Sequence, residues 1–403
     1  MRISTSMLND MAVNGILQDE SALSITENQL STGLSINTPA DNPVGAVQLL
    51  QLNNTNTQYQ QYISNGQSAN ANLTLEQTAL SSSTTTLQSI RDLVVQANSA
   101  TNNTSDLQSI ATQIQQLEQQ LLGTANGQNA QGQYLFAGYS VGTQPFVRGS
   151  SGSVSYVGDS GASSVPLDGG TSVQTGDPGS SVYMNIPSGN GTFTTAASTS
   201  NTGTGVIDAG SVTDASQWTP DPYTISFSSP TQYTVTDETT GDVVVPDGTY
   251  DSSTGGNITF NGVEIGLSGA PAAGDTFTVA PSSTQSIFNT LDSLVSSLNN
   301  AGSGAASRAQ LSSSLAESLQ QIDQALSQVS TVTTNVGSRI SLIGSVNNSL
   351  TSQSTTVTTE ISNLDSLNYA AATSQYSQEY LALQAAEESY AQLGQLSLFK
   401  YLS

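Results

Sequence analysis

The chain has 403 residues and contains neither cysteine nor histidine. These two residue types supply most general bases, thiolate nucleophiles and zinc ligands in proteins. Their absence excludes a Ser-His-Asp triad, a cysteine nucleophile and an ordinary zinc site. An active site would have to use paired carboxylates, a lysine or tyrosine nucleophile, or a cation held by oxygen ligands.

Three aspartates, Asp242, Asp247 and Asp251, lie close together in the sequence. Such carboxylates can bind a cation or hydrolyse a glycosidic bond. Aspartate and glycine are also the residues that hairpin turns favour, and the spacing is not that of an EF-hand. The glycine pairs at 169–170 and 255–256 are followed by no lysine, so they are not phosphate-binding loops. We therefore expect turns here, with no catalytic residue, no metal, no cofactor and no enzymatic activity.

Tyr134, Phe136 and Tyr139 form a short aromatic segment. Aromatic side chains can bind a glycan, and they also bury large areas where two parts of a protein meet. We expect these three to pack where a helical region joins a β-rich region. The competing hypothesis is a carbohydrate-active or adhesive secreted protein that binds sugars through the β-rich region.

The charge balance is strongly acidic, with 6 Lys and Arg residues against 30 Asp and Glu residues and a net charge of −24. A chain with so few cations cannot neutralise phosphates, which excludes nucleic acid and anionic membranes as partners. Only 9% of the residues are charged, so hydroxyls and amides must solvate the surface. This composition fits a disordered chain or an extracellular protein with a thin core, and the strong periodicity described below favours the second.

No stretch approaches the roughly 20 apolar residues of a membrane span. Residues 1–10 lack the apolar segment of a cleavable secretory signal. If the protein leaves the cell, we expect it to do so by another route.

The first region, from residue 1 to about 147, has the apolar spacing of long helices. Leu73, Leu80, Leu87 and Val94 are seven residues apart, as in a coiled coil. A break is expected between residues 31 and 43. Glycine can end a helix in the left-handed conformation, proline is excluded from a helix interior but favoured at its first position, and Asp or Asn caps a helix start. The residues expected to form this turn are Gly33, Pro39, Asp41, Asn42 and Pro43.

The last region, from about 285 to 403, carries the longest apolar pattern. Eight residues spaced by seven predict one long helix with an intramolecular heptad seam: Leu315, Ile322, Val329, Val336, Ile343, Leu350, Val357 and Leu364. The companion row of this seam consists of Leu319, Leu326, Ile340 and Ile361, and it is interrupted by Thr333, Asn347 and Ser354. A final stripe, from Tyr369 to Leu393, is out of register with the seam, which predicts a bend near Asn368.

The middle region, residues 148–283, predicts β-structure. Apolar and polar residues alternate in 223–227 and 233–236, and turn signals occur at Asp247-Gly248, Gly255-Gly256 and Asn261-Gly262. No lysine or arginine occurs between Arg148 and Arg308, so we expect an acidic surface.

A long helix needs a partner for its apolar stripe, and the nearest partner is the other end of the same chain. We therefore predict a mainly α fold with an inserted β-rich domain, its long N- and C-terminal helices paired in a coiled-coil bundle. The expected domains are a terminal assembly domain (1–64 with 341–403), a helical rod (65–147 with 284–340) and an outward-facing β-rich insert (148–283). Stripe residues at the extreme ends should be buried between subunits: Met7, Met11, Leu23, Leu30, Tyr369, Tyr376, Leu383, Tyr390 and Leu393.

Four segments resemble one known family. They are the opening residues 1–7, the turn at 30–43, the segment Gln133–Tyr139 followed by Pro145-Phe146, and residues 274–279 leading into 285–288. Together they are similar to the hook–filament junction family of the bacterial flagellum, the third hook-associated proteins, within the flagellin superfamily. The superfamily usually has a basic residue next to the signature glycine, whereas Leu34 and Ser35 follow Gly33 here.

The resemblance implies a flagellin-like bundle and export through the flagellar type III apparatus. It also implies a ring of copies of the chain between the first hook-associated protein and flagellin, and an export chaperone that holds the C-terminal helix. The alternative within the superfamily is a flagellin, the filament subunit. The opening residues and the segment 133–139 favour the junction family.

Overall fold

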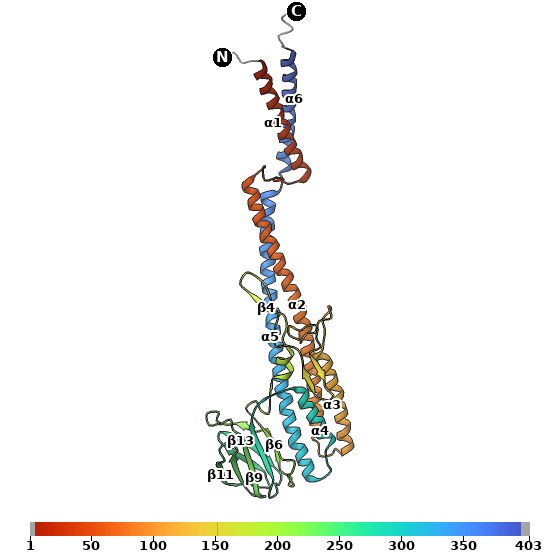
Figure 1. Cartoon of the computed structure of the whole chain (residues 1–403), viewed down its shortest axis with the longest axis vertical. Helices are drawn as coiled ribbons and strands as arrows, with labels where there is room; N and C mark the ends of the chain where they lie inside the picture. The colour runs from red at the N-terminus through yellow and green to blue at the C-terminus, as the bar shows by residue number, and fades with distance from the viewer. Residues whose placement is uncertain (1–4, 151, 396–403) are drawn as a thin grey trace, which may run out of the picture. The chain divides into compact units, whose positions relative to one another are not determined.

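The computed structural model describes residues 5–150 and 152–395. Long helices come from both ends of the chain, as Figure 1 shows. They are α1 (Thr5–Thr32), α2 (Pro43–Ala97), α3 (Thr104–Ala125), α4 (Ile287–Asn299), α5 (Ala305–Asp365) and α6 (Tyr369–Gln395). The strands lie between α3 and α4 in the sequence. This order confirms the predicted fold class, a mainly α chain with a β-rich insert.

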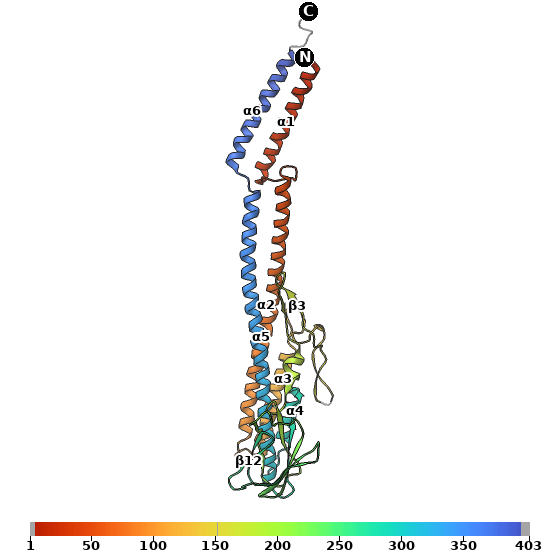
Figure 2. The ribbon, with the colours of Figure 1, turned by 90° about the vertical axis from the view of Figure 1, so that its left-hand side faces the viewer.

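The chain forms two compact units, one of residues 1–64 with 346–403 and the other of residues 65–345. In the first, the terminal unit, α1 and α6 lie side by side (Figures 1 and 2). Ala372 and Thr26 are buried between them, and the Thr26 hydroxyl donates to Glu379 Oε2 at 2.6 Å. The start of α2 pairs with the end of α5 through Ser354, which donates to Asn56 Oδ1 at 2.7 Å and accepts from Gln60 Nε2 at 2.9 Å.

In the second unit, α2, α3, α4 and α5 each bury an apolar face. The stripe from Leu73 to Val94 on α2 is buried, and so are the apolar faces of α3 and α4. Asn103 and Asp106 begin α3 with a capping box, each side chain accepting from the backbone N–H of the other residue. The predicted first helical region is too long, because α3 ends at Ala125 and residues 126–145 are irregular.

The buried face of α5 changes along its length. From residue 315 to 336 these buried residues follow steps of three and four, with Gln321 buried beside them: Leu315, Ser318, Ile322, Ala325, Val329, Val332 and Val336. From 336 to 350 the buried apolar residues of α5 are seven apart. The expected companions Leu319, Leu326 and Ile340 are only half-buried. The structure therefore places the companion row three residues after the seam residues, where smaller side chains fit.

Two antiparallel sheets form a β-sandwich within residues 193–281. The larger has the order β11 (Val243–Thr249), β10 (Gln232–Asp237), β9 (Tyr223–Ser229), β14 (Thr276–Pro281), β6 (Phe193–Ala197). The smaller has the order β12 (Gly256–Phe260), β13 (Val263–Ser268), β7 (Val206–Ile207), with β8 (Ser211–Val212) also paired to β13. One apolar core lies between them because alternate residues, such as Tyr223, Ile225 and Phe227, point inward.

The turn predicted at Asn261-Gly262 joins β12 to β13, and both residues have positive φ, as a type I′ turn requires. The turn predicted at Asp247-Gly248 is wrong, because both residues belong to β11. Gly248 lies opposite Tyr233, and a Cβ there would come within 2.4 Å of the tyrosine ring. This glycine makes room for a neighbouring side chain.

Shorter elements connect the sandwich to the helices. They are the hairpins β1 (Phe146–Arg148) with β2 (Val154–Tyr156) and β3 (Ser164–Pro166) with β4 (Ser172–Gln174), the π-helix η1 (Ser180–Met184), and the pair β5 (Ile186–Pro187) with β15 (Thr284–Gln285). The sandwich also contacts the first turns of α5. Ser313 Oγ accepts from the Ile207 N–H at 3.2 Å, and Gln310 Nε2 donates to the Asn201 carbonyl at 2.9 Å.

Candidate assembly surface

The turn between α1 and α2 is built around Gly33. Its φ of 76° is the left-handed conformation that ends a helix, and its N–H donates to the Gln29 carbonyl at 2.8 Å. A Cβ at this position would come within 2.8 Å of the Tyr369 hydroxyl oxygen. The backbone conformation therefore favours glycine here, and the missing Cβ also leaves room for the tyrosine hydroxyl at the start of α6.

Backbone hydrogen bonds tie this turn to the break between α5 and α6. The Ser35 N–H donates to the Asp365 carbonyl at 2.6 Å, and the Leu367 N–H donates to the Gly33 carbonyl at 3.0 Å. The Asp365 carboxylate also accepts from the Ile36 N–H at 3.2 Å. Two of these bonds join peptide groups, and the third uses the Asp365 carboxylate.

The remaining turn residues prepare the start of α2. Asp41 Oδ2 accepts from the backbone N–H groups of Thr38 and Asn37, at 2.7 and 3.0 Å, and the bond from Thr38 is the main cause of the lowered pKa of Asp41. Asn42 Oδ1 accepts from the Gly45 N–H at 2.9 Å as the helix cap. Pro43 is the first residue of α2, and Pro39 lies in the turn before it.

The nine residues expected at a subunit interface fall into two groups. Met7, Met11, Tyr369 and Tyr390 are exposed. Leu23, Leu30, Tyr376 and Leu383 are half-buried, because α1 and α6 cover part of each other. The side chain of Leu393 lies outside the described residues.

Sequence reasoning missed several exposed apolar residues of the same two helices. Leu17, Tyr380 and Leu381 are 56%, 52% and 63% exposed. They do not belong to the seven-residue stripe, so periodicity gave no signal for them. Together with Met7 and Met11 they are uncovered apolar side chains of the α1–α6 pair, and exposed apolar groups are characteristic of protein–protein contacts. We call these five residues the terminal surface.

The intramolecular seam is buried over most of its length. Leu315, Ile322, Val329, Val336, Ile343 and Leu350 are each at most 3% exposed. Val357 and Leu364, near the end of α5, are half-buried.

The three aspartates of the insert do not form a site. Asp251 accepts from the backbone and hydroxyl of Ser253 as a turn residue, and these bonds lower its pKa. Asp247 is in β11, and the Asp242 carbonyl accepts from the Asp237 N–H across a turn. Within residues 5–150 and 152–395, no cluster of three or more Asp or Glu side chains is arranged to hold a metal ion.

The aromatic segment is divided between two environments. Phe136 is fully buried and contacts Tyr183 edge-on, with ring centroids 5.5 Å apart. Tyr134 is half-buried, and Tyr139 is 65% exposed. Phe136 belongs to an aromatic cluster with Phe146 and Phe288 that joins the first hairpin and η1 to α4.

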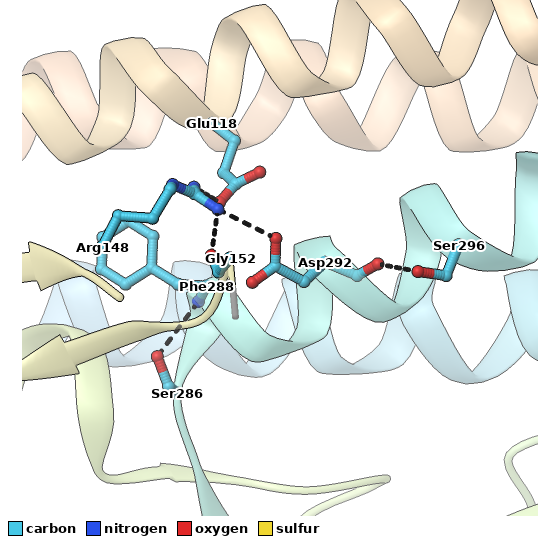
Figure 3. A network of polar contacts seen from close by, with 7 residues as sticks. All are labelled: Glu118, Arg148, Gly152, Ser286, Phe288, Asp292 and Ser296. Carbon is cyan, nitrogen blue, oxygen red and sulfur yellow. Dashed lines mark hydrogen bonds and ion pairs between the residues drawn. The ribbon is translucent and has the colours of Figure 1, made fainter. Parts of the chain in front are cut away.

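The four described arginines are all used within the second unit. Figure 3 shows Arg148 between α3 and α4, where it pairs with Glu118 and with Asp292 and donates to the Gly152 carbonyl. Burial raises the pKa of Glu118, and the hydrogen bond from Arg148 opposes this shift. Arg91 pairs with Asp323 and Arg339 with Asp177, while Arg308 donates to the carbonyls of Ala100 and Asn102. Each described arginine therefore contacts residues of its own unit.

Comparisons with known proteins match this architecture. The family model of the bacterial flagellin N-terminal helical region covers residues 3–141, and that of its C-terminal helical region covers residues 319–402. Residues 196–281, most of the β-sandwich, match the D2-like domain of flagellar hook-associated protein 1. No described helix is long and apolar enough to cross a membrane.

Solved structures extend the likeness to most of the chain. The crystal structure of Xanthomonas campestris FlgL is 32% identical with a TM-score of 0.70, covering 76% of this chain and 97% of that one. The chain belongs to the FlgL family, the flagellar hook-associated protein 3 family. The flagellar junction protein FlgL from Legionella pneumophila is 30% identical with a TM-score of 0.71, covering 78% of this chain and all of that chain.

FlgL sequences are matched over a shorter length than FlgL structures. Flagellar hook-associated protein 3 of Salmonella typhimurium is 33% identical over 152 residues, which is 38% of this chain and 48% of that protein. The aligned part thus spans about half of this curated relative. A flagellin of Escherichia coli is 36% identical over 115 residues, only 20% of its length. The FlgL family is therefore better supported than the flagellin alternative.

Proposed function

We propose that this chain is a structural subunit of the bacterial flagellum that joins the hook to the flagellin filament. Its partners would be further copies of itself in a ring, the first hook-associated protein on the hook side and flagellin on the filament side. An export chaperone would hold the C-terminal helix before assembly. The role is structural and extracellular, and it requires no catalysis.

The terminal surface is the observation that carries this proposal. Met7, Met11 and Leu381 are each more than half exposed on helices that already pair within the chain. Tyr380 and Leu17, on the same two helices, are also more than half exposed. Aromatic and methionine side chains suit protein interfaces because they bury large areas and adapt their shape. Subunit and neighbour contacts would cover these residues.

A reconstitution experiment tests the proposal. Hooks purified from a strain lacking this protein receive the purified chain and then flagellin, and filament growth is followed by electron microscopy. The full chain should restore growth, whereas a chain ending at residue 367 should not. Adding the chain in vitro separates assembly from export, since the missing segment is also the expected chaperone site.

Matched point variants keep the result interpretable. Tyr380→Asn with Leu381→Asn removes apolar area from α6, and Gln378→Asn with Gln384→Asn changes two exposed polar residues of the same helix. Only the first pair should reduce filament growth. Normal filaments from the truncated chain, or equal growth with both double variants, would show that α6 does not make the assembly contact.

A further inference from the structure

A cavity of about 310 Å³ lies in the second unit, beside the aromatic segment that precedes the first hairpin. Its walls come from α2, from residues 129–141 and from the chain at 161–163 and 175–177. The volume is at the lower end of the roughly 300–1,000 Å³ that small-molecule sites occupy. The terminal surface lies on other helices, so the function proposed above makes no use of this cavity.

Tyr139 forms an exposed wall of this cavity and is fixed by its neighbours. The residue is 65% exposed, yet its N–H donates to Asp159 Oδ1 at 2.9 Å and its hydroxyl donates to the Ala162 carbonyl at 3.3 Å. A Cβ on Gly161 would overlap the ring, so this glycine leaves the space in which the ring lies. An aromatic ring that is fixed in advance loses little freedom when a ligand stacks on it.

The other side chains around the cavity are mostly polar. Asn72 and Gln133 contribute amides, and Ser163 and Thr175 contribute hydroxyls. Asn72 is half-buried on α2 and has no side-chain hydrogen bond to another described residue. Covering such groups with an apolar ligand would be costly, because they would lose water without gaining a partner. The lining therefore favours a ligand that donates and accepts hydrogen bonds.

The electrostatics favour an uncharged ligand. Among the described residues that line the cavity, Asp177 alone has a charged side chain, and Arg339 already neutralises it through two hydrogen bonds at 2.8 and 3.0 Å. Glu76 lies behind Gly176, and burial raises the pKa of this glutamate to about 8. Its carboxyl is therefore largely protonated at neutral pH. A cation finds no free carboxylate here, and the net charge of −24 repels phosphates and other anions.

We propose that this cavity binds a neutral saccharide, with the Tyr139 ring against one face of a sugar unit and the Asn72 and Gln133 amides bonded to its hydroxyls. The C–H groups on one face of a pyranose ring carry a slight positive charge, which suits the negative face of an aromatic ring. Sugar hydroxyls both donate and accept, as side-chain amides do. This inference does not depend on the proposed function, and it places the sugar outside the β-sandwich.

Saturation-transfer NMR on the purified full chain tests the proposal. The probes are three uncharged disaccharides that differ in linkage and in N-acetyl groups: maltose, cellobiose and N,N′-diacetylchitobiose. At least one should bind with a Kd on the order of 1 mM, and the protons on one face of a sugar ring should receive the most saturation. If none of the three receives saturation at concentrations up to about 10 mM, tenfold above that Kd, the proposal is overturned.

Two variants of Tyr139 separate the ring from its hydroxyl. Tyr139→Ala removes the stacking face and should weaken binding at least about tenfold. Tyr139→Phe keeps the ring and should bind within about threefold of the unaltered chain. The control is Val147→Ala, because Val147 is exposed in the neighbouring hairpin and does not line the cavity. Equal binding by Tyr139→Ala and the unaltered chain would reject the proposed site.

A glycine variant tests the position of the ring without removing it. Gly161→Ala would displace the Tyr139 ring and should weaken binding, whereas Gly142→Ala has no atom near its Cβ and should bind normally. Neither glycine has a positive φ, so the backbone accepts alanine at both positions. Thermal unfolding checks that each variant is folded. Equal binding by the two glycine variants would contradict stacking on the ring.

A second matched pair tests the hydrogen bonds to the sugar. Asn72→Ala removes the unpartnered amide on α2 and should raise the Kd severalfold, because a sugar hydroxyl then loses its partner. Asn70→Ala, an exposed position two residues away that does not line the cavity, should leave the Kd unchanged. The same Kd for both asparagine variants would show that Asn72 does not contact the sugar and would overturn the proposed binding mode.

Discussion

Arg339 donates from its two terminal guanidinium nitrogens to the two carboxylate oxygens of Asp177, at 2.8 and 3.0 Å. Glu76 on α2 lies beside this pair, and its Oε1 accepts from the Asp177 N–H at 3.1 Å. Its Oε2 is buried and has no hydrogen-bond partner among the described residues. Burial, followed by the charge of Asp177, raises the pKa of Glu76 to about 8. Folding therefore favours the protonated form of Glu76.

This arrangement predicts that the helical rod loses stability as the pH rises. The pKa of Glu76 is higher in the folded chain than its ordinary value of 4.5. Its contribution is therefore complete below about pH 4.5 and is lost as the pH rises to about 8. At 1.36 kcal/mol for each pKa unit, the loss is a few kcal/mol at most. Urea unfolding measured at pH 5.5, 7 and 8.5 should show it.

Glu76→Gln should remove most of this pH dependence and should raise the free energy of unfolding at pH 8.5. Glu238→Gln, at an exposed turn of the sandwich, is the control and should leave the pH dependence unchanged. An unaltered pH profile in Glu76→Gln would contradict the assignment.

Arg148→Met should be strongly destabilising. Glu118 is 3% exposed and would keep a buried carboxyl without its cation, which typically costs about 3–5 kcal/mol. Because the pKa of Glu118 is already raised by burial, protonation should relieve part of the loss at low pH. The control is Arg91→Met, because Arg91 and its partner Asp323 are 43% and 42% exposed. Its free energy of unfolding should fall by less than about 1 kcal/mol. Similar melting temperatures for the two variants would count against a structural role for Arg148.

Ile343→Asp should strongly destabilise the helical rod. Ile343 is 1% exposed in the seam, and an unpaired buried charge costs about 3–5 kcal/mol. Ser345→Asp lies two residues away on the exposed side of the same helix and should be tolerated. Thermal unfolding followed by circular dichroism compares them, and equal melting temperatures would reject the seam.

Gly33→Ala should lower the free energy of unfolding of the terminal unit by about 1–2 kcal/mol. Alanine is strained at a φ of 76°, and its Cβ would meet the Tyr369 hydroxyl. Limited proteolysis should then cut faster at the turn. Adding Tyr369→Phe should restore the part of the loss that is due to the hydroxyl. Gly15→Ala, within α1 and with no atom near its Cβ, should be neutral or stabilising. Unchanged proteolysis of Gly33→Ala would mean that the turn tolerates a side chain.

The helical part of this fold follows from local patterns. Apolar residues such as Leu80 and Ile343 repeat at a spacing that only a paired helix explains, and Gly33 and Pro43 mark a helix end and a helix start by their backbone restrictions. The companion row of α5 could not be predicted in the same way. Large side chains such as Leu319 indicate apolar contact, whereas the structure buries small ones such as Ser318.

The β-insert depends on pairings between distant residues. β14 lies between β9 and β6, a strand order that no local signal specifies. Gly248 has the local signature of a turn, but its role is to leave space for Tyr233 on the neighbouring strand. The exposure of Val47 could not be predicted either, because it depends on which face of α2 packs against α5.

The two backbone hydrogen bonds that tie residues 33–35 to residues 365–367 have a mechanical consequence. The polypeptide passes this level of the terminal unit twice, once between α1 and α2 and once between α5 and α6. Because the two linkers are hydrogen-bonded to each other, neither can lengthen unless the other lengthens with it or both bonds break. A tensile load applied along α6 is therefore shared with the turn at Gly33, and the joint yields at a higher force than either linker would alone.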